Sequence, residues 1–78
     1  MTNSTLLRLK IKNKGFRLSH LVCKLNTSYA WLKKKIDGEI PFKNDEILIL
    51  SKILELTDSE IMDIFFADEV DKMTTKNQ

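Results

Sequence analysis

Residues 18–37 constrain the fold of this chain more than any other segment. Apolar residues recur four apart in each half of the stretch, first Leu21 and Leu25, then Leu32 and Ile36. Residues four apart lie on the same side of an α-helix, so each half predicts a short helix with one buried face. Asn26 lies between the halves, and asparagine tolerates the left-handed backbone conformation that ends a helix. The stretch therefore predicts two helices joined by a tight turn.

Three further helices are predicted around this pair from their end signals. In chain order, the predicted helices cover about residues 5–14, 18–25, 28–36, 45–56 and 58–67. The predicted caps at their N-terminal ends are Asn3 or Ser4, Thr27, Asn44 and Thr57, the last in a capping box with Glu60. Gly15 and Gly38 follow two of these helices, where glycine commonly ends a helix.

Composition supports a single, wholly helical domain. Two glycines and one proline among 78 residues are too few for a sheet with many turns. Short connections between the helices favour one compact unit, so we expect an all-α, five-helix domain over residues 1–67. Its second and third helices form a helix-turn-helix. The polar segment 68–78 has no apolar period, and we expect it to be a frayed or disordered tail.

Several classes of function lack the residues that they need. Cys23 is the only cysteine, so no internal disulfide can form, and a lone thiol fits a reducing compartment. No apolar run approaches the ~20 residues that cross a bilayer, and the N-terminus lacks the pattern of a signal peptide. His20 lies three residues before Cys23 without the further groups that a nucleophile or a zinc site requires. We therefore expect a cytoplasmic protein with no membrane partner, no enzyme activity, no metal and no cofactor.

The charge of the chain is strongly asymmetric, although the net charge is only +2. Residues 1–43 hold ten Lys or Arg and two acids, whereas residues 44–78 hold three Lys and nine acids. A basic half supplies contacts to phosphates and speeds the encounter with a polyanion. The acidic half would repel DNA and so orient the domain on it. The alternative is that both charge runs are solvated faces without a partner.

The third predicted helix holds the residues best suited to contact DNA. If Leu32 and Ile36 face the interior, the other side is free, and the N-terminal end of such a helix meets base edges in the major groove. The predicted contacts at or near the bases are Ser28, Tyr29, Ala30 and Lys33. The predicted phosphate contacts are Arg17, Lys34, Lys35 and Lys43. The alternative for the three consecutive lysines is an ordinary solvated run.

Trp31 leaves three interpretations open. It lies next to Leu32 and four residues before Lys35, at the edge of the apolar stripe. It can pack in the core, lie against the sugar-phosphate backbone, or anchor a protein partner. The last interpretation follows from chemistry, because an exposed tryptophan beside Tyr29 makes a good binding hot spot.

Five short segments, in this order and spacing, carry a family resemblance. They are Lys14-Gly15-Phe16, Leu21 with Leu25, Lys35-Ile36-Asp37-Gly38, Asn44-Asp45-Glu46-Ile47 and Ile64-Phe65-Phe66. Through them the segment 6–66, about four-fifths of the chain, resembles the Cro/repressor-type (XRE-like) helix-turn-helix family. It is most similar to the small Cro-like switch proteins of temperate phages from Firmicute bacteria. The resemblance implies a regulator that binds double-stranded operator DNA and takes part in the choice between lysogeny and lytic growth.

The chain departs from that family where the DNA-facing residues lie. Arg17 and Leu18 replace the usual cap and glutamine at the start of the second helix. Polar residues of the recognition helix give way to Tyr29, Ala30 and Trp31. Leu18, Tyr29 and Trp31 thereby become predicted contacts for a protein, and the second hypothesis is an antirepressor that binds the phage repressor through this surface. Two-fold symmetric operators suggest a homodimer on DNA, whereas no dimer element is evident and a monomer in solution stays open.

Overall fold

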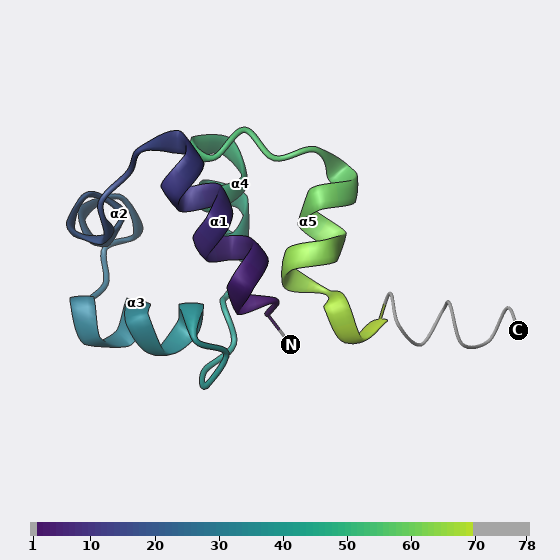
Figure 1. Cartoon of the computed structure of the whole chain (residues 1–78). Coiled ribbons are helices and arrows are strands. Elements are labelled where there is room, and N and C mark those ends of the chain that lie inside the picture. Colours follow the sequence, from purple (N-terminus) through teal and green to yellow (C-terminus); the bar gives the residue numbers. More distant parts are fainter. Residues whose placement is uncertain (1, 70–78) are drawn as a thin grey trace, which may run out of the picture.

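The computed structural model describes residues 2–69, and every regular element in this part of the chain is helical. The helices are α1 (Ser4–Lys14), α2 (Leu18–Leu25), α3 (Tyr29–Ile36), α4 (Asn44–Ile53) and α5 (Asp58–Phe65) (Figure 1). Residues 67–69 are helical again after a break at Phe66. The prediction of an all-α domain is confirmed.

α2 and α3 form the predicted pair, and the turn between them depends on Asn26. This residue has φ 52° and ψ 50°, the left-handed conformation, and its N–H donates to the carbonyl of Cys23. The N–H of Thr27 donates to the carbonyl of Val22, which closes the end of α2. The helix-turn-helix therefore lies where the apolar spacing predicts it, with α2 packed against both α3 and α4.

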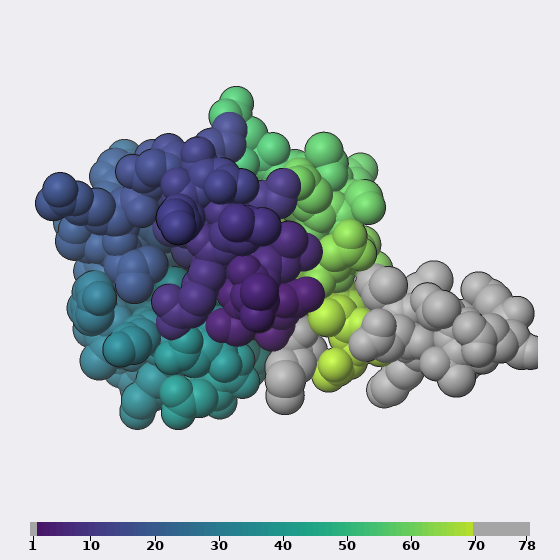
Figure 2. Space-filling view, in the orientation of Figure 1, coloured from purple at the N-terminus to yellow at the C-terminus, as the bar shows by residue number. Residues whose placement is uncertain are grey.

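The core contains the periodic apolar residues of all five helices. Its buried members are Leu7, Ile11, Leu21, Leu25, Leu32, Ile36, Phe42, Leu50, Leu54, Ile64 and Phe65. α1 packs against α3 and α5, so it joins the helix-turn-helix to the C-terminal end of the domain. Figure 2 shows α1 across the middle of one face, with α2 and α3 on one side of it and α5 on the other.

Local end signals set most helix boundaries as expected. The Asn3 side chain accepts a hydrogen bond from the N–H of Leu6, and Gly15 ends α1 at φ 76°. Thr57 and Glu60 form the predicted capping box of α5, with bonds of 3.1 Å from the Glu60 N–H to the Thr57 hydroxyl and 2.9 Å from the Thr57 N–H to the Glu60 carboxylate. These signals act between residues three apart, which is why the sequence reveals them.

Two predicted caps are wrong by one residue. Ser28, not Thr27, caps α3, and its hydroxyl accepts from the Trp31 N–H at 3.1 Å. At α4 the cap position is Lys43, and Asn44 is the first helical residue. Lys43 has no side-chain acceptor for this role, and instead its backbone N–H donates to the Glu46 carboxylate at 2.8 Å.

The C-terminal boundaries also differ from those predicted. α4 ends at Ile53 rather than near 56, because Glu55 takes a left-handed conformation at φ 53°. α5 ends at Phe65 rather than 67, and residues 67–69 then form a separate helical stretch. Residues 68 and 69, placed in the predicted tail, therefore belong to a helix. The rest of that predicted tail, 70–78, lies outside the described residues.

Candidate nucleic-acid interface

α3 has a buried side and an exposed side, as the apolar spacing predicts. Leu32 and Ile36 are fully buried. The exposed residues are Tyr29, Ala30, Trp31, Lys33 and Lys34; we call them the outer face of α3. Because no other helix within residues 2–69 covers this face, every member that the sequence assigns to base or phosphate contact is available to a ligand.

Lys35 is a correction to the predicted phosphate contacts. It is 6% exposed, and its ammonium donates to both carboxylate oxygens of Glu46, at 2.7 and 2.6 Å. Lys35 lies three residues after Leu32 and one before Ile36, so it turns toward the inner side of the helix. The ammonium is already neutralised inside the protein, and the prediction that it holds a phosphate is wrong.

Ser28 keeps part of the role predicted for it. Its hydroxyl oxygen accepts from the N–H of Trp31 and so caps α3, while the hydroxyl hydrogen remains a donor. The side chain is exposed at the N-terminal end of the helix. A contact from Ser28 to a base or phosphate stays a prediction, now limited to donation from the hydroxyl.

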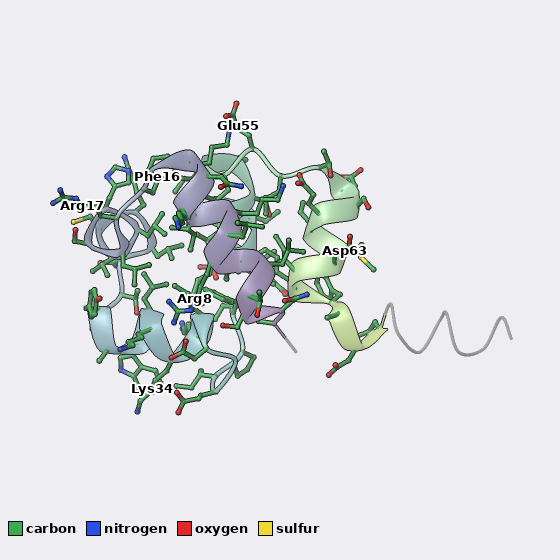
Figure 3. All side chains as sticks on the ribbon, viewed as in Figure 1. Arg8, Phe16, Arg17, Lys34, Glu55 and Asp63 are labelled. Atoms are coloured by element: carbon green, nitrogen blue, oxygen red, sulfur yellow. The ribbon has the colours of Figure 1, made fainter. Side chains whose placement is uncertain are left out.

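Trp31 is 52% exposed, so of the three interpretations core packing is wrong. Tyr29, two residues earlier, is 54% exposed. The ammonium of Lys34 lies 5.8 Å from the centroid of the Trp31 ring, within range of a cation–π contact. Figure 3 shows Lys34 on the side of α3 that is turned away from the rest of the fold.

The cations of α1 are mostly neutralised within the domain. Arg8 pairs with Asp37, Lys10 with Glu60, and Lys14 with Glu55. The hydrogen bond from Lys14 lowers the pKa of the Glu55 carboxyl below its ordinary value of 4.5, and the charge of Lys14 adds to the effect. The hydrogen bond from Lys10, with that from the Thr57 backbone, likewise lowers the pKa of Glu60. The pairs of Lys10 and Lys14 join α1 to the acidic half of the chain.

Other cations have no carboxylate partner among residues 2–69. They are Lys12, Arg17, Lys24, Lys33, Lys34, Lys43 and Lys52. The group contains three of the four predicted phosphate contacts, all but Lys35. Arg17 stands at the N-terminal cap position of α2 and makes no capping bond through its side chain, so its guanidinium is free to bind an anion (Figure 3).

Leu18 is less available to a protein partner than Tyr29 and Trp31. It is half-buried and packs against the core from the first turn of α2. Near it the ring of His20 stacks on Phe16, with centroids 5.3 Å apart. Both His20 and Cys23 are exposed. No group of three His, Cys, Asp or Glu residues within 2–69 is placed to hold a metal ion.

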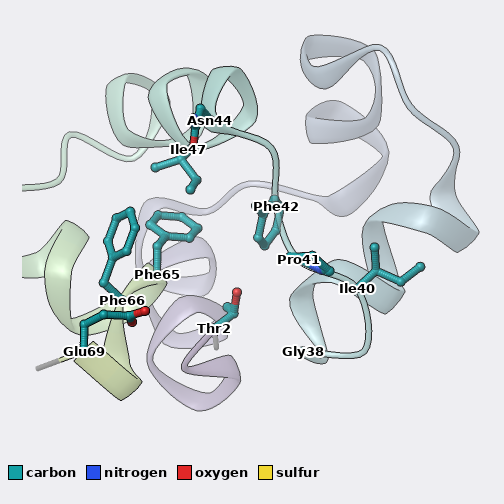
Figure 4. Close-up of a pocket in the computed structure, with 10 residues that line it drawn as sticks. All are labelled: Thr2, Gly38, Ile40, Pro41, Phe42, Asn44, Ile47, Phe65, Phe66 and Glu69. Carbon is teal, nitrogen blue, oxygen red and sulfur yellow. The ribbon is translucent and has the colours of Figure 1, made fainter. Parts of the chain in front are cut away.

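A hollow that the sequence did not predict lies between α5 and the loop that follows α3. Its volume is about 370 Å³, and the rings of Phe42, Phe65 and Phe66 form much of its wall (Figure 4). Phe42 and Phe65 meet edge to face, with centroids 5.4 Å apart. The sequence feature that could have indicated this hollow is the apolar run 40–42, which lies in a predicted loop. No residue predicted to contact DNA lines this hollow.

Of the helices that the structure describes, none is both long and apolar enough to cross a membrane. Comparison of the chain with models of known protein families, with curated proteins and with solved structures finds no significant match.

Proposed function

We propose that the chain is a DNA-binding transcriptional regulator whose α3 lies in the major groove of operator DNA. The observation that carries the proposal is the outer face of α3, where Lys33 and Lys34 are exposed and have no carboxylate partner within residues 2–69, while the opposite side of the helix is buried. A helix with one buried side, held by a preceding helix and carrying free cations on the other side, has the arrangement that major-groove readers use.

The dimensions and charges fit this placement. An α-helix with its side chains is about 10–12 Å across, and the major groove is about 12 Å wide. Tyr29 and Ala30, in the first turn of α3, face the base edges together with Lys33. Ser28, just before the helix, donates from its hydroxyl. Phosphates on either side of the groove are neutralised by Arg17, Lys34 and Lys43.

The biological setting of the proposal comes from the resemblance to Cro-like phage proteins. Such a regulator takes part in the choice between lysogeny and lytic growth. Operators of this family are often two-fold symmetric, and two copies of the chain then occupy two half-sites about one helical turn apart, 34–36 Å. The unpaired lysines supply the salt-dependent part of the affinity.

A second candidate function is favoured by the aromatic residues. Tyr29 and Trp31 are each more than half exposed, and they lie in the first turn of α3 on either side of Ala30. Exposed tryptophan and tyrosine surrounded by cations are typical of hot spots in protein interfaces. An antirepressor uses this surface, with Leu18 at its edge, to bind the phage repressor. The same protein can hold both roles.

The only tryptophan, Trp31, reports on both candidates. Its fluorescence is followed while duplexes that tile the DNA around the gene are added at about 50 and 200 mM salt. DNA binding predicts a saturable change that weakens steeply with salt. The repressor protein is titrated separately. A response to the repressor without any response to DNA contradicts the first proposal and supports the second.

A further inference from the structure

Resting on the proposed DNA-binding function, we propose that α3 selects its site mainly through the methyl groups of thymine. Base pairs are usually read in the major groove by side chains that hydrogen-bond to one base: arginine or lysine on guanine, asparagine or glutamine on adenine. Acidic side chains accept from cytosine. The sequence of α3, Tyr29–Ile36, contains no arginine, amide or acidic side chain, so lysine is the only one of these residue types that it offers.

The hydrogen-bond donors that α3 does offer are poorly suited to select a base. Lys33 and Lys34 end in single ammonium groups, which act as point charges and lack the planar fork of arginine. The ammonium of Lys34, one turn after Ala30 on the same side of α3, also lies 5.8 Å from the centre of the Trp31 ring. The hydroxyl oxygen of Ser28 already accepts from the Trp31 N–H. The outer face therefore has few hydrogen bonds to give to base edges.

The first turn of the outer face is apolar. Ala30 lies two residues before the fully buried Leu32, so it is about 160° around the helix from the core side. Its methyl group is exposed. Tyr29 precedes Ala30 in the sequence and Trp31 follows it, and their side chains are 54% and 52% exposed. The part of the helix that enters the groove first thus presents a methyl group flanked by aromatic rings.

Only one group in the major groove matches such a surface. The C5 methyl of thymine is the sole apolar substituent that the four base pairs display there. Burial of one methyl against an apolar partner changes the affinity by about fourfold. Two or three contacted thymines then give about 15-fold to 60-fold discrimination.

The test begins with the full chain and a random duplex library. Duplexes that bind are enriched, and the preferred one is made again with deoxyuridine in place of thymidine at its central positions. Uracil pairs with adenine as thymine does and lacks only the C5 methyl. We expect the uracil duplex to bind at least fourfold more weakly with an unchanged salt slope, and uracil in the flanks to have no effect.

A variant assigns the effect to α3. Ala30→Gly removes the methyl in the first turn of the outer face, and we expect it to bind thymine and uracil duplexes with nearly equal affinity. Thr5→Gly, an exposed helical position on α1, is the matched control and keeps the difference. Equal binding of both duplexes by the unaltered chain overturns this inference and leaves DNA binding intact. Failure to enrich any duplex overturns the proposed function as well.

Discussion

α1 and α3 are both rich in basic residues, yet their cations are placed differently. In α1, Arg8, Lys10 and Lys14 pair with carboxylates, and only Lys12 among its four basic residues has no such partner within 2–69. In α3 the proportions are reversed. Lys35 is paired inside the domain, while Lys33 and Lys34 extend from the outer face.

The difference shows how a charge count overstates the charge that a ligand meets. Among the described residues, three ion pairs connect the basic half of the chain to the acidic half, through Glu46, Glu55 and Glu60. Glu55 and Glu60 lower the positive potential around α1. The positive potential around the outer face of α3 remains. The acidic half was expected to repel DNA; its carboxylates also neutralise Lys10 and Lys14 of α1 and the buried Lys35 of α3.

The largest expected effect is the difference in unfolding free energy between variants of two adjacent lysines of α3, Lys34 and Lys35. Lys35→Met leaves the Glu46 carboxylate charged and almost fully buried, with the Lys43 N–H as its remaining donor. Loss of one partner from a buried ion pair costs about 3–5 kcal/mol in unfolding free energy. The same change at exposed Lys34 should cost less than about 0.5 kcal/mol. Urea unfolding of the two variants measures the contrast.

A double variant checks the cause. Lys35→Met with Glu46→Gln removes the buried charge, while the amide oxygen still accepts from the Lys43 N–H. Stability should recover in part relative to Lys35→Met alone. Equal loss of stability for Lys34→Met and Lys35→Met would contradict the assignment of inner and outer sides to α3.

A smaller effect is expected from the ion pairs of α1, and it depends on pH. Glu55 and Glu60 have pKa values lowered below 4.5 in the folded protein, so the unfolded chain binds more protons near that pH. The stability that these pairs contribute is present above pH 4.5 and is lost as the pH falls through the lowered values. Glu55→Gln with Glu60→Gln should unfold more easily at neutral pH and converge with the unaltered chain in acid.

Thermal unfolding across pH 7 to 3 measures this difference. Lys33→Ala with Lys34→Ala is the control, because the outer face of α3 makes no such pair among the described residues, and its pH profile should run parallel to that of the unaltered chain. A profile for the Gln double variant that also runs parallel would show that the α1 pairs contribute nothing to acid sensitivity.

The sequence predicts best what depends on neighbours along the chain. The four-residue spacing of Leu21, Leu25, Leu32 and Ile36 identified two buried faces, and all four residues are buried. The sequence predicts the turn at Asn26 because glycine and asparagine are the residue types that usually adopt the left-handed conformation at the end of a helix. Thr27 and Ser28 are equally good caps, so the choice between them depends on where the backbone turns.

What the sequence could not predict depends on contacts between distant residues. Lys33, Lys34 and Lys35 are identical side chains. The helical spacing turns Lys35 toward the inner side, but its burial as an ion pair depends on Glu46, which packing brings to it. The pairing of Lys10 with Glu60 joins residues 50 positions apart. The aromatic hollow likewise needs Phe42 and Phe65 to be brought together by packing.

The central claim is that free cations on the outer face of α3, rather than the basic residues of α1, bind the DNA backbone. Two charge-matched variants test it: Lys33→Ala with Lys34→Ala, and Lys10→Ala with Lys14→Ala. The measurement is the slope of log affinity against log salt for one duplex. The α3 variant should reduce the slope by about 0.9 for each lysine that neutralises a phosphate, up to about 1.8, while the α1 variant leaves it unchanged. Equal reductions, or a larger one for α1, would contradict the claim.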